Sequence, residues 1–410
     1  MKVAFFLLHY PVFSETFVSK EILNLQQLGV EGQIFCEKII STPPVHPHIK
    51  RIHFPLYQIT QKIIGPKIFS LLSSHLYYLF HQPLSYFQSI SLLISFFNFH
   101  HFRIFIKAPL LARFLTEYNF DLIYAHEVDS PSLLALICSR LCHIPCGIII
   151  HTQYLFAQNK YLTSKVKNAN FIIFQSHHSL KQSQKITRLP QKYFTKCHVI
   201  STPGIDTKFF QPPLVQKFPK QIRIISIGRL EEAKGYPLLL KAIHHLKSTF
   251  PDIQLTIVGD GSQQHQLENY ILKNNLQNNI HLTGAIGHNS KLIKLLHRHQ
   301  YFILPSIVDS QNNHDVHPNV IKEAMSSGLI TITTRLGGIT EIIHDSQNGF
   351  LINSATLSNI CKIIKKVYLL PKSQKINISD SARQTILQHH QQVDICGQLK
   401  QVFSDQIHEK

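Results

Sequence analysis

Short apolar runs alternate with longer amphipathic segments along most of this 410-residue chain. A short apolar run bounded by polar or glycine positions is typical of a buried strand, whereas an apolar position every three or four residues is typical of a helix. The predicted strands are 2–8, 121–124, 147–151, 171–174, 222–227, 254–258, 280–283, 301–304 and 330–333. Helical patterns lie between the strands, among them residues 14–28 and 130–142.

The alternation of strands with helices predicts an α/β fold built from parallel sheets. The strands fall into two sets that join near residues 200–213, so we expect two doubly wound, Rossmann-like domains facing a central cleft. Ligands of such sheets bind beyond the carboxyl ends of the strands, which makes the cleft the expected active site. The expected domains are residues 1–205 and 206–375, and residues 376–410 are expected to form helices that cross back to the first domain.

Residues 54–114 do not follow this alternation. They are rich in Phe, Tyr, Leu and Ile, with scattered Lys, Arg and His. One interpretation is a helical insertion packed on the first domain. The other is a basic and aromatic surface that lies on an anionic membrane. The sequence leaves both interpretations open.

The charge of the chain points to an anionic partner. Lys and Arg number 41 against 23 Asp and Glu, which gives a formal net charge of +18, and 27 His add to it at slightly acid pH. Such a surplus suits a nucleic acid, a membrane surface or a phosphorylated substrate. No recognised nucleic-acid-binding motif is present and the basic residues are spread along the chain, so we expect no nucleic-acid partner.

The N-terminus and the cysteines carry less information. The first apolar run imitates a signal peptide, but it is interrupted at His9 and Pro11 and no small-residue cleavage site follows, so a buried strand is expected. No apolar stretch has the length of a membrane-spanning helix. Seven cysteines, an odd number, argue against a disulfide framework and favour a reducing compartment. The three cysteines within residues 138–146 are interpreted as core residues rather than metal ligands, because Pro145 breaks the helix that would align them.

The strongest chemical signal lies within residues 301–351. Asp315 precedes Pro318, and Glu323 follows Asp315 by eight residues. Pro318 is suited to open a helix that ends near residue 327. The N-terminus of that helix would offer free N–H groups and partial positive charge to a pyrophosphate. One carboxylate could then reach a sugar and the other the hydroxyls of a ribose.

A second signal follows the first predicted strand of the C-terminal half. That strand ends at Gly228, Arg229 comes next, and Lys234 and Gly235 open the following helix. Two cations beside a helix start can stabilise a diphosphate leaving group without a metal. The next strand runs into a glycine turn, where Gly259 is expected to line the binding site of a nucleotide base.

Together, in this order, these residues resemble the C-terminal half of the family 4 retaining glycosyltransferases, which have the GT-B fold. The family's Glu-x7-Glu motif, strand–Gly–Arg…Lys–Gly element, Gly-Gly-x-x-Glu segment and hinge signature all have counterparts. In that order they are Asp315 and Glu323; Gly228, Arg229, Lys234 and Gly235; Gly337, Gly338 and Glu341; and Gly204, Asp206 and Phe210. The N-terminal YPVFSETFVSKEI is similar to the SETF opening of transferases that build extracellular polysaccharides such as colanic acid.

The resemblance implies a role for each matching residue. Arg229 and Lys234 would bind the diphosphate of the donor, Glu323 would hold its ribose, and Asp315 would contact the transferred sugar as a catalytic residue. His151 matches the His-Gly-x-Asp element of the family and would face the donor sugar or the reaction centre. Further substrate contacts are implied for Ser14, Glu15, Gly259, His317 and Pro318.

The implied reaction displaces a nucleoside diphosphate from an anomeric carbon with retention of configuration. The donor would be a UDP- or GDP-sugar, and neither a bound metal nor another cofactor is implied. The acceptor would be a growing cell-surface glycan of an exopolysaccharide, capsule or lipopolysaccharide, carried on a lipid. The protein would then be cytoplasmic and peripheral at the inner face of the cell membrane.

Two departures from the family pattern keep other functions open. Asp315 is one methylene shorter than the family's Glu, so that its carboxylate reaches about 1.5 Å less, and Val316 stands where the family has glycine. A binding protein that holds a sugar nucleotide or glycan without turnover is therefore one alternative. A sugar-nucleotide epimerase of the same architecture is another, although the SETF opening and the hinge signature argue against it.

Overall fold

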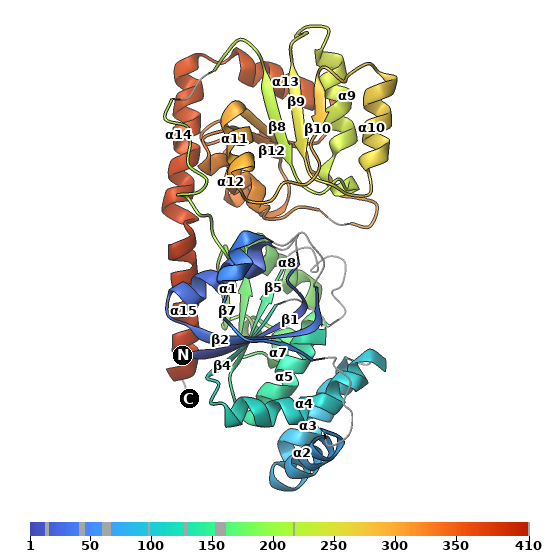
Figure 1. The fold of residues 1–410 in the computed structure, drawn as a ribbon, viewed down its shortest axis with the longest axis vertical. Coiled ribbons are helices and arrows are strands. Elements are labelled where there is room, and N and C mark those ends of the chain that lie inside the picture. The colour runs from blue at the N-terminus through green and yellow to red at the C-terminus, as the bar shows by residue number, and fades with distance from the viewer. Residues whose placement is uncertain are drawn as a thin grey trace. The chain divides into compact units, whose positions relative to one another are not determined.

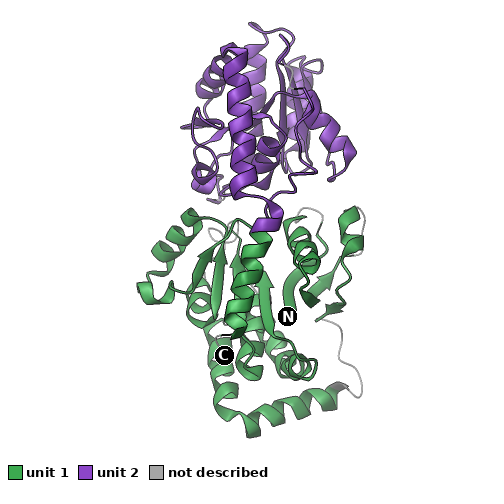
Figure 2. Ribbon diagram, turned by 90° about the vertical axis from the view of Figure 1, so that its left-hand side faces the viewer, with its two compact units in different colours: residues 1–203, 395–410 green, residues 204–394 purple. Residues whose placement is uncertain are grey.

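The computed structural model describes residues 1–12, 16–40, 46–59, 67–96, 99–126, 130–151, 161–215, 218–312 and 314–408. The chain divides into two units, which are coloured separately in Figure 2. Unit 1 comprises residues 1–203 together with 395–410, and unit 2 comprises residues 204–394. Each unit has its own sheet and its own hydrophobic cores.

Unit 1 is built on a seven-stranded sheet with the strand order β3-β2-β1-β4-β5-β6-β7 (Figure 1). All neighbouring strands are parallel. The strands are β1 (Lys2–Tyr10), β2 (Glu31–Ile39), β3 (Leu56–Gln58), β4 (Leu122–His126), β5 (Cys146–Ile150), β6 (Phe171–Phe174) and β7 (Cys197–Val199). A parallel sheet whose strands are buried on both faces explains why β4, β5 and β6 are apolar apart from His126 at the end of β4.

The four strands expected in this unit are confirmed as β1, β4, β5 and β6, with small differences at their ends. The other three strands were not expected. The sequence of β2, EGQIFCEKI, mixes charged and apolar positions without a clear period. The edge strands β3 and β7 are three residues long, too short for a pattern to develop.

Helices cover both faces of this sheet. One face carries α5 (Ser130–Cys142), α7 (Leu162–Asn168) and α8 (His177–Thr187), and the other carries α1 (Thr16–Gln27) and α15 (Gln392–His408). The predicted helix 130–142 is confirmed as α5, and Cys138 and Cys146 lie in the core beneath it, as expected from their interpretation as core residues.

The aromatic segment of unit 1 forms three successive helices, α2 (Lys67–His81), α3 (Pro83–Ser95) and α4 (Phe99–Glu117). α4 packs on α5, α2 packs on α4, and α3 packs on α5. Their inner side chains, including Tyr78, Leu92 and Ala112, belong to the core of unit 1. The interpretation as a packed helical insertion is therefore confirmed for the inner faces of these helices.

Unit 2 is built on a six-stranded parallel sheet with the order β10-β9-β8-β11-β12-β13. The strands are β8 (Arg223–Ile227), β9 (Gln254–Val258), β10 (Ile280–Leu282), β11 (Tyr301–Leu304), β12 (Ile330–Thr334) and β13 (Phe350–Ile352). The first five confirm the predicted strands of this half, whereas the three-residue edge strand β13 was not expected. The strand order reverses direction at β8, where doubly wound sheets bind their ligands.

Helices also cover both faces of the second sheet (Figure 1). One face carries α9 (Tyr236–Leu246), α10 (Gln264–Lys273) and α13 (Leu357–Leu369). The other carries α11 (Ser290–Arg298), α12 (Asn319–Ser326) and α14 (Lys372–His389).

The expected C-terminal segment 376–410 is divided between the units. Residues 376–389 of this segment lie in α14 and belong to unit 2. Arg383 of α14 donates hydrogen bonds to the carbonyl oxygens of Thr207, Phe210 and Ser326 in the same unit. Only α15 packs on the sheet of unit 1, through Leu399 and its apolar neighbours. The expectation that the whole segment returns to the first domain is thus wrong for α14.

Candidate active site

The candidate residues of unit 2 come from loops that follow the carboxyl ends of neighbouring strands. β8 leads into Gly228 and Arg229, and β11, its neighbour in the sheet, leads into Ser306. The backbone N–H of Ile307 donates to the carbonyl oxygen of Ala233 at 2.9 Å, which ties the two loops together. Parallel strands bring their carboxyl ends to one edge, so this convergence follows from the topology.

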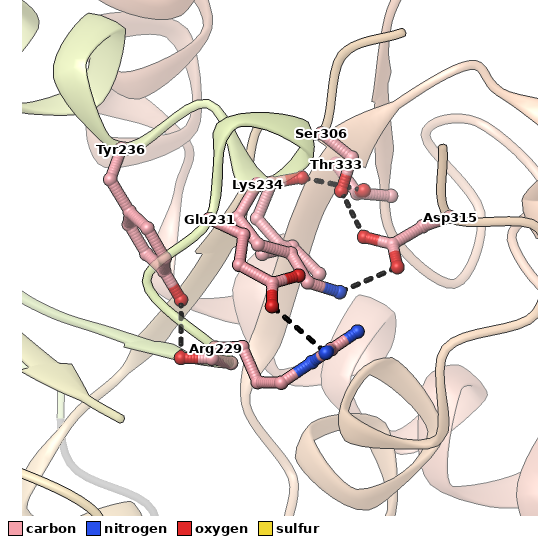
Figure 3. A network of polar contacts seen from close by, with 9 residues as sticks. Arg229, Glu231, Lys234, Tyr236, Ser306, Asp315 and Thr333 are labelled. Atoms are coloured by element: carbon pink, nitrogen blue, oxygen red, sulfur yellow. Dashed lines mark hydrogen bonds and ion pairs between the residues drawn. The ribbon is translucent and has the colours of Figure 1, made fainter. Parts of the chain in front are cut away.

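Lys234 and Asp315 form the centre of the site, although 81 positions separate them in the chain (Figure 3). The ammonium nitrogen of Lys234 lies 2.5 Å from Oδ1 of Asp315. The hydroxyl of Ser306 donates to Oδ2 of the same carboxylate, also at 2.5 Å. The Lys234 and Asp315 side chains are 14% and 15% exposed, so the pair is largely shielded and still reachable from solvent.

Arg229 lies beside this pair and is more open. Its Nη1 is 2.8 Å from Oε1 of Glu231, and 53% of its side chain is exposed. Figure 3 shows the cationic ends of Arg229 and Lys234 directed to the same region as the Asp315 carboxylate. An exposed ion pair is weak, because water screens it and two side chains must be held in place. The guanidinium can therefore leave Glu231 for a phosphate at little cost.

Two glycines allow the loops to approach one another this closely. Gly259 has φ +151°, and a Cβ there would lie 1.9 Å from the carbonyl oxygen of Gly228. Gly235 has φ +67°, and a Cβ there would lie 2.1 Å from the carbonyl oxygen of Pro305. No other residue fits either position. The structure thus places Gly259 against the turn that carries Arg229, and the predicted contact with a nucleotide base stays a prediction.

The predicted helix after Asp315 is confirmed as α12, with Pro318 as its N-cap residue. Asp315 lies in the preceding loop, as the sequence predicted. Glu323, inside the helix, has its Oε1 at 3.4 Å from Nε2 of His288, and only 6% of its side chain is exposed. The carboxylate faces His288, and its predicted contact with a ribose stays a prediction.

His317 lies on the inner side of the same loop. Its Nδ1 is 3.4 Å from the ammonium of Lys322, and its ring centroid is 6.0 Å from that of His390. Burial, and then the charge of Lys322, hold the pKa of His317 well below its usual range, while burial lowers the pKa of Lys322 to about 7. The ring thus lies between Lys322 and His390, and the expected substrate contact of His317 stays a prediction.

The candidate residue of unit 1 that the structure describes is His151, directly after β5. Its Nε2 is 3.3 Å from Nδ1 of His126, whose Nε2 lies 3.1 Å from a carboxylate oxygen of Glu21. All three side chains are nearly inaccessible to solvent. Burial first, and then His126, lower the pKa of His151 to about 3, so the ring is neutral at ordinary pH. Ser14 and Glu15 lie outside the described residues.

The sequence did not reveal five neighbours of these residues, which are Glu21, His126, Glu231, His288 and Ser306. A usable signal exists for two of them. His126 is the last residue of a buried strand, and Ser306 follows another strand by two positions. Polar residues at the carboxyl end of parallel strands lie at the ligand-binding edge. The remaining three lie on a helix or in loops, where spacing along the chain does not predict contacts.

Potential metal ligands do not cluster in the described part of the chain. No three His, Cys, Asp or Glu side chains there are close enough together to hold a metal ion. The groups that could hold a diphosphate are instead the cations Arg229 and Lys234.

Comparison with known proteins identifies the domain that carries this site. Residues 208–385 match the family model described as glycosyl transferases group 1. The structure of Anabaena Alr3699/HepE in complex with UDP and glucose superposes with a TM-score of 0.72 over 98% of this chain and 99% of that chain, at 17% identity. The C-terminal half thus carries a group 1 glycosyltransferase domain, and the fold is that of the GT-B glycosyltransferases.

Two relatives match by sequence over part of the chain. A phosphatidylinositol N-acetylglucosaminyltransferase subunit of Arabidopsis thaliana is 27% identical over 58% of this chain and 53% of its own length. The putative colanic acid biosynthesis glycosyltransferase WcaL of Escherichia coli K12 is 27% identical over 37% of each protein. The matched region spans only about half the length of the plant relative.

Proposed function

We propose that this protein is a retaining glycosyltransferase that moves a hexose-type sugar from a UDP- or GDP-sugar to a growing cell-surface glycan. The observation that carries the proposal is the cluster of Lys234, Asp315 and Arg229 at the carboxyl ends of β8 and β11. It lies in the group 1 glycosyltransferase domain, and Asp315 belongs to the loop that precedes α12.

The two cations suit the charge that such a transfer develops. The anomeric carbon–oxygen bond breaks, the transition state resembles an oxocarbenium ion, and negative charge grows on the leaving diphosphate. Lys234 and Arg229 neutralise that charge, and the N-terminus of α12 adds its partial positive charge. No metal is needed for this step, because the cations do the work that a divalent ion does elsewhere.

The ion pairs of the site set a condition on donor binding. Lys234 contacts Asp315 at 2.5 Å, so a phosphate must share the ammonium with the carboxylate or displace it. Ser306 keeps a second hydrogen bond to Asp315 and holds the carboxylate in place when Lys234 moves. Asp315 is then free to accept a hydrogen bond from a hydroxyl of the transferred sugar.

The proposed acceptor is a lipid-linked glycan at the cytoplasmic face of the membrane. The names of the relatives support it, since one is named for phosphatidylinositol and the other for colanic acid. The net charge of +18 also suits an anionic surface.

Donor hydrolysis tests the proposal. The purified protein is incubated with a panel of UDP- and GDP-sugars, with and without EDTA, and the released nucleoside diphosphate and free sugar are measured. Slow release from one donor, insensitive to EDTA, supports the proposal, and retention is checked from the anomeric configuration of the first-formed sugar. A donor converted to its epimer without release of diphosphate would instead identify an epimerase.

A second candidate is a binding protein that holds the sugar nucleotide without turnover. Asp315 favours it, because this carboxylate is shorter than the family's Glu and is engaged by both Lys234 and Ser306. That candidate predicts tight donor binding, no release by the native chain, and release by the Asp315→Glu variant.

A further inference from the structure

The outer face of α2 is apolar and open to solvent. Phe69, Leu72, Leu76 and Phe80 are 78%, 58%, 44% and 75% exposed. Their spacing of three and four residues places them in one stripe along the helix. A stripe of this composition ordinarily faces a core, yet here it is the opposite side of α2 that packs, through Tyr78.

A second exposed apolar stripe lies on α3, which follows α2 after the single residue Gln82. Leu84, Phe87 and Ile94 are 72%, 59% and 65% exposed, and they again lie on one face of the helix. The inner face of α3 packs through Leu92. Because both inner faces are engaged in the core, neither helix can turn its outer face inward. We call these seven side chains of α2 and α3 the apolar face.

The segment that carries the apolar face contains cations and no carboxylate. No Asp or Glu occurs between Glu37 and Glu117, while Lys, Arg and His recur throughout that stretch. The adjoining helix α4 exposes Arg103 and Arg113. Arg113 lies against α2, with its guanidinium carbon 5.1 Å from the centre of the Tyr77 ring, and Glu117 follows Arg113 by one turn of α4.

We propose that the apolar face of α2 and α3 docks on an anionic phospholipid bilayer, with α2 and α3 lying in the interface and the arginines of α4 at the headgroups. An apolar face bordered by cations is the pattern of helices that lie in a membrane surface. In the described part of the chain, no helix is both long and apolar enough to cross a membrane. The attachment is therefore to one leaflet.

Charge favours the bilayer over a second copy of this chain. In a symmetric dimer through the apolar face, two segments that carry cations and no carboxylate over residues 38–116 would meet. An anionic leaflet removes this repulsion and covers the apolar side chains at the same time. The inference rests on the proposed function, because a lipid-linked acceptor is presented at the same membrane surface.

The chain offers a clean spectroscopic test, since it contains no tryptophan. Full-length Phe80→Trp is titrated with vesicles of phosphatidylcholine alone and of phosphatidylcholine mixed with phosphatidylglycerol. We expect the tryptophan emission to shift to the blue when anionic vesicles are added. The protein should bind anionic vesicles at least tenfold more strongly than neutral ones, and salt should weaken this binding. The matched control is Leu272→Trp on α10, which replaces a leucine that is 59% exposed in unit 2 and should not shift.

Vesicle flotation of the native chain and of further variants completes the test. Phe69→Ser combined with Phe80→Ser should weaken binding at least tenfold, and Arg113→Gln about fivefold, while Leu272→Ser should bind as the native chain does. Thermal unfolding verifies that the variants are folded. Equal binding to neutral and anionic vesicles, or native binding by the double serine variant, would overturn the inference. The inference would also be overturned if the native chain formed a dimer in the absence of vesicles and the double serine variant did not.

No sugar nucleotide is present in these measurements. If the native chain does not bind the bilayer, only the docking surface is refuted. If the native chain does not hydrolyse any donor, only the proposed function is refuted.

Discussion

Unit 1 and unit 2 both gather polar side chains at the carboxyl ends of parallel strands, but they differ in how far those side chains reach solvent. In unit 2, Arg229 is half exposed and the Lys234–Asp315 pair is partly open. In unit 1, His126 and His151 are sealed inside, together with Glu21 of α1. The open cluster can exchange its internal ion pairs for those of a ligand, whereas the sealed one can only orient its own members.

The outer surfaces differ in the opposite direction. Unit 2 packs two cores around its sheet and exposes single apolar side chains such as Leu272 and Leu369, while unit 1 exposes the apolar face of α2 and α3. The comparison teaches that one fold used twice can divide its tasks. In this account the charged ligand belongs to unit 2 and the membrane belongs to unit 1. The predictions below test that division, beginning with the largest expected effect.

Lys234→Ala should lower the rate of donor hydrolysis at least a hundredfold, because it removes a cation aimed at the leaving diphosphate. The measurement is the release of nucleoside diphosphate by the variant and the native chain. Lys241→Ala, which removes an exposed lysine of α9, is the matched control and should retain native activity. A Lys234→Ala variant as active as this control would refute the role assigned to the open cluster.

Gly259→Ala should destabilise the protein by about 3 kcal/mol, because a Cβ at this position meets the carbonyl oxygen of Gly228 at 1.9 Å. Gly284→Ala is the matched control. It also has positive φ, but nothing lies within 4 Å of its Cβ, so it should cost only about 1 kcal/mol. Urea unfolding of both variants gives the difference, and equal losses would show that the close approach of the two turns does not matter.

Glu21→Gln should lower the free energy of unfolding by about 2 kcal/mol, since it leaves His126 without its buried anionic neighbour. Glu31→Gln, at an exposed position at the start of β2, should change it by less than about 0.5 kcal/mol. Chemical denaturation measures both. If Glu21→Gln is as stable as Glu31→Gln, the sealed cluster of unit 1 is not held together by charge.

Each unit also contains a buried histidine whose folded pKa is about 3, His151 in unit 1 and His390 in unit 2. Between the unfolded value of about 6.5 and pH 3, the unfolded chain binds a proton that the folded chain does not. Stability is therefore lost as the pH falls through this window, by up to about 1.4 kcal/mol per pH unit for each group.

His390→Gln should make this decline shallower, and His265→Gln, whose side chain is almost fully exposed, should not. Urea unfolding at several pH values between 7 and 4 distinguishes the two. A native slope in His390→Gln would contradict the assigned cause.

The sequence predicted the elements better than the contacts between them. β4, β5 and β6 are apolar runs apart from His126 at the end of β4, and such runs identify a strand buried on both faces. β2 was not predicted because its polar positions follow no period, and β13 was not predicted because three residues show no pattern.

For the site, spacing placed Asp315 ahead of a helix and Lys234 at the start of another, and the topology then brought them together. The distance of 2.5 Å between them and the third partner Ser306 depend on loop conformations that no spacing encodes. The inward direction of His317 has the same origin, because it depends on Lys322 and His390 behind the loop.

The most direct test of the division between the units is a calorimetric titration of the full chain with UDP and with GDP in the presence of EDTA. One nucleotide should bind the native chain. Lys234→Ala should weaken that binding at least tenfold, while Glu21→Gln and the double variant Phe69→Ser with Phe80→Ser should bind as the native chain does. Native affinity in Lys234→Ala, or loss of binding through the variants of unit 1, would contradict the account.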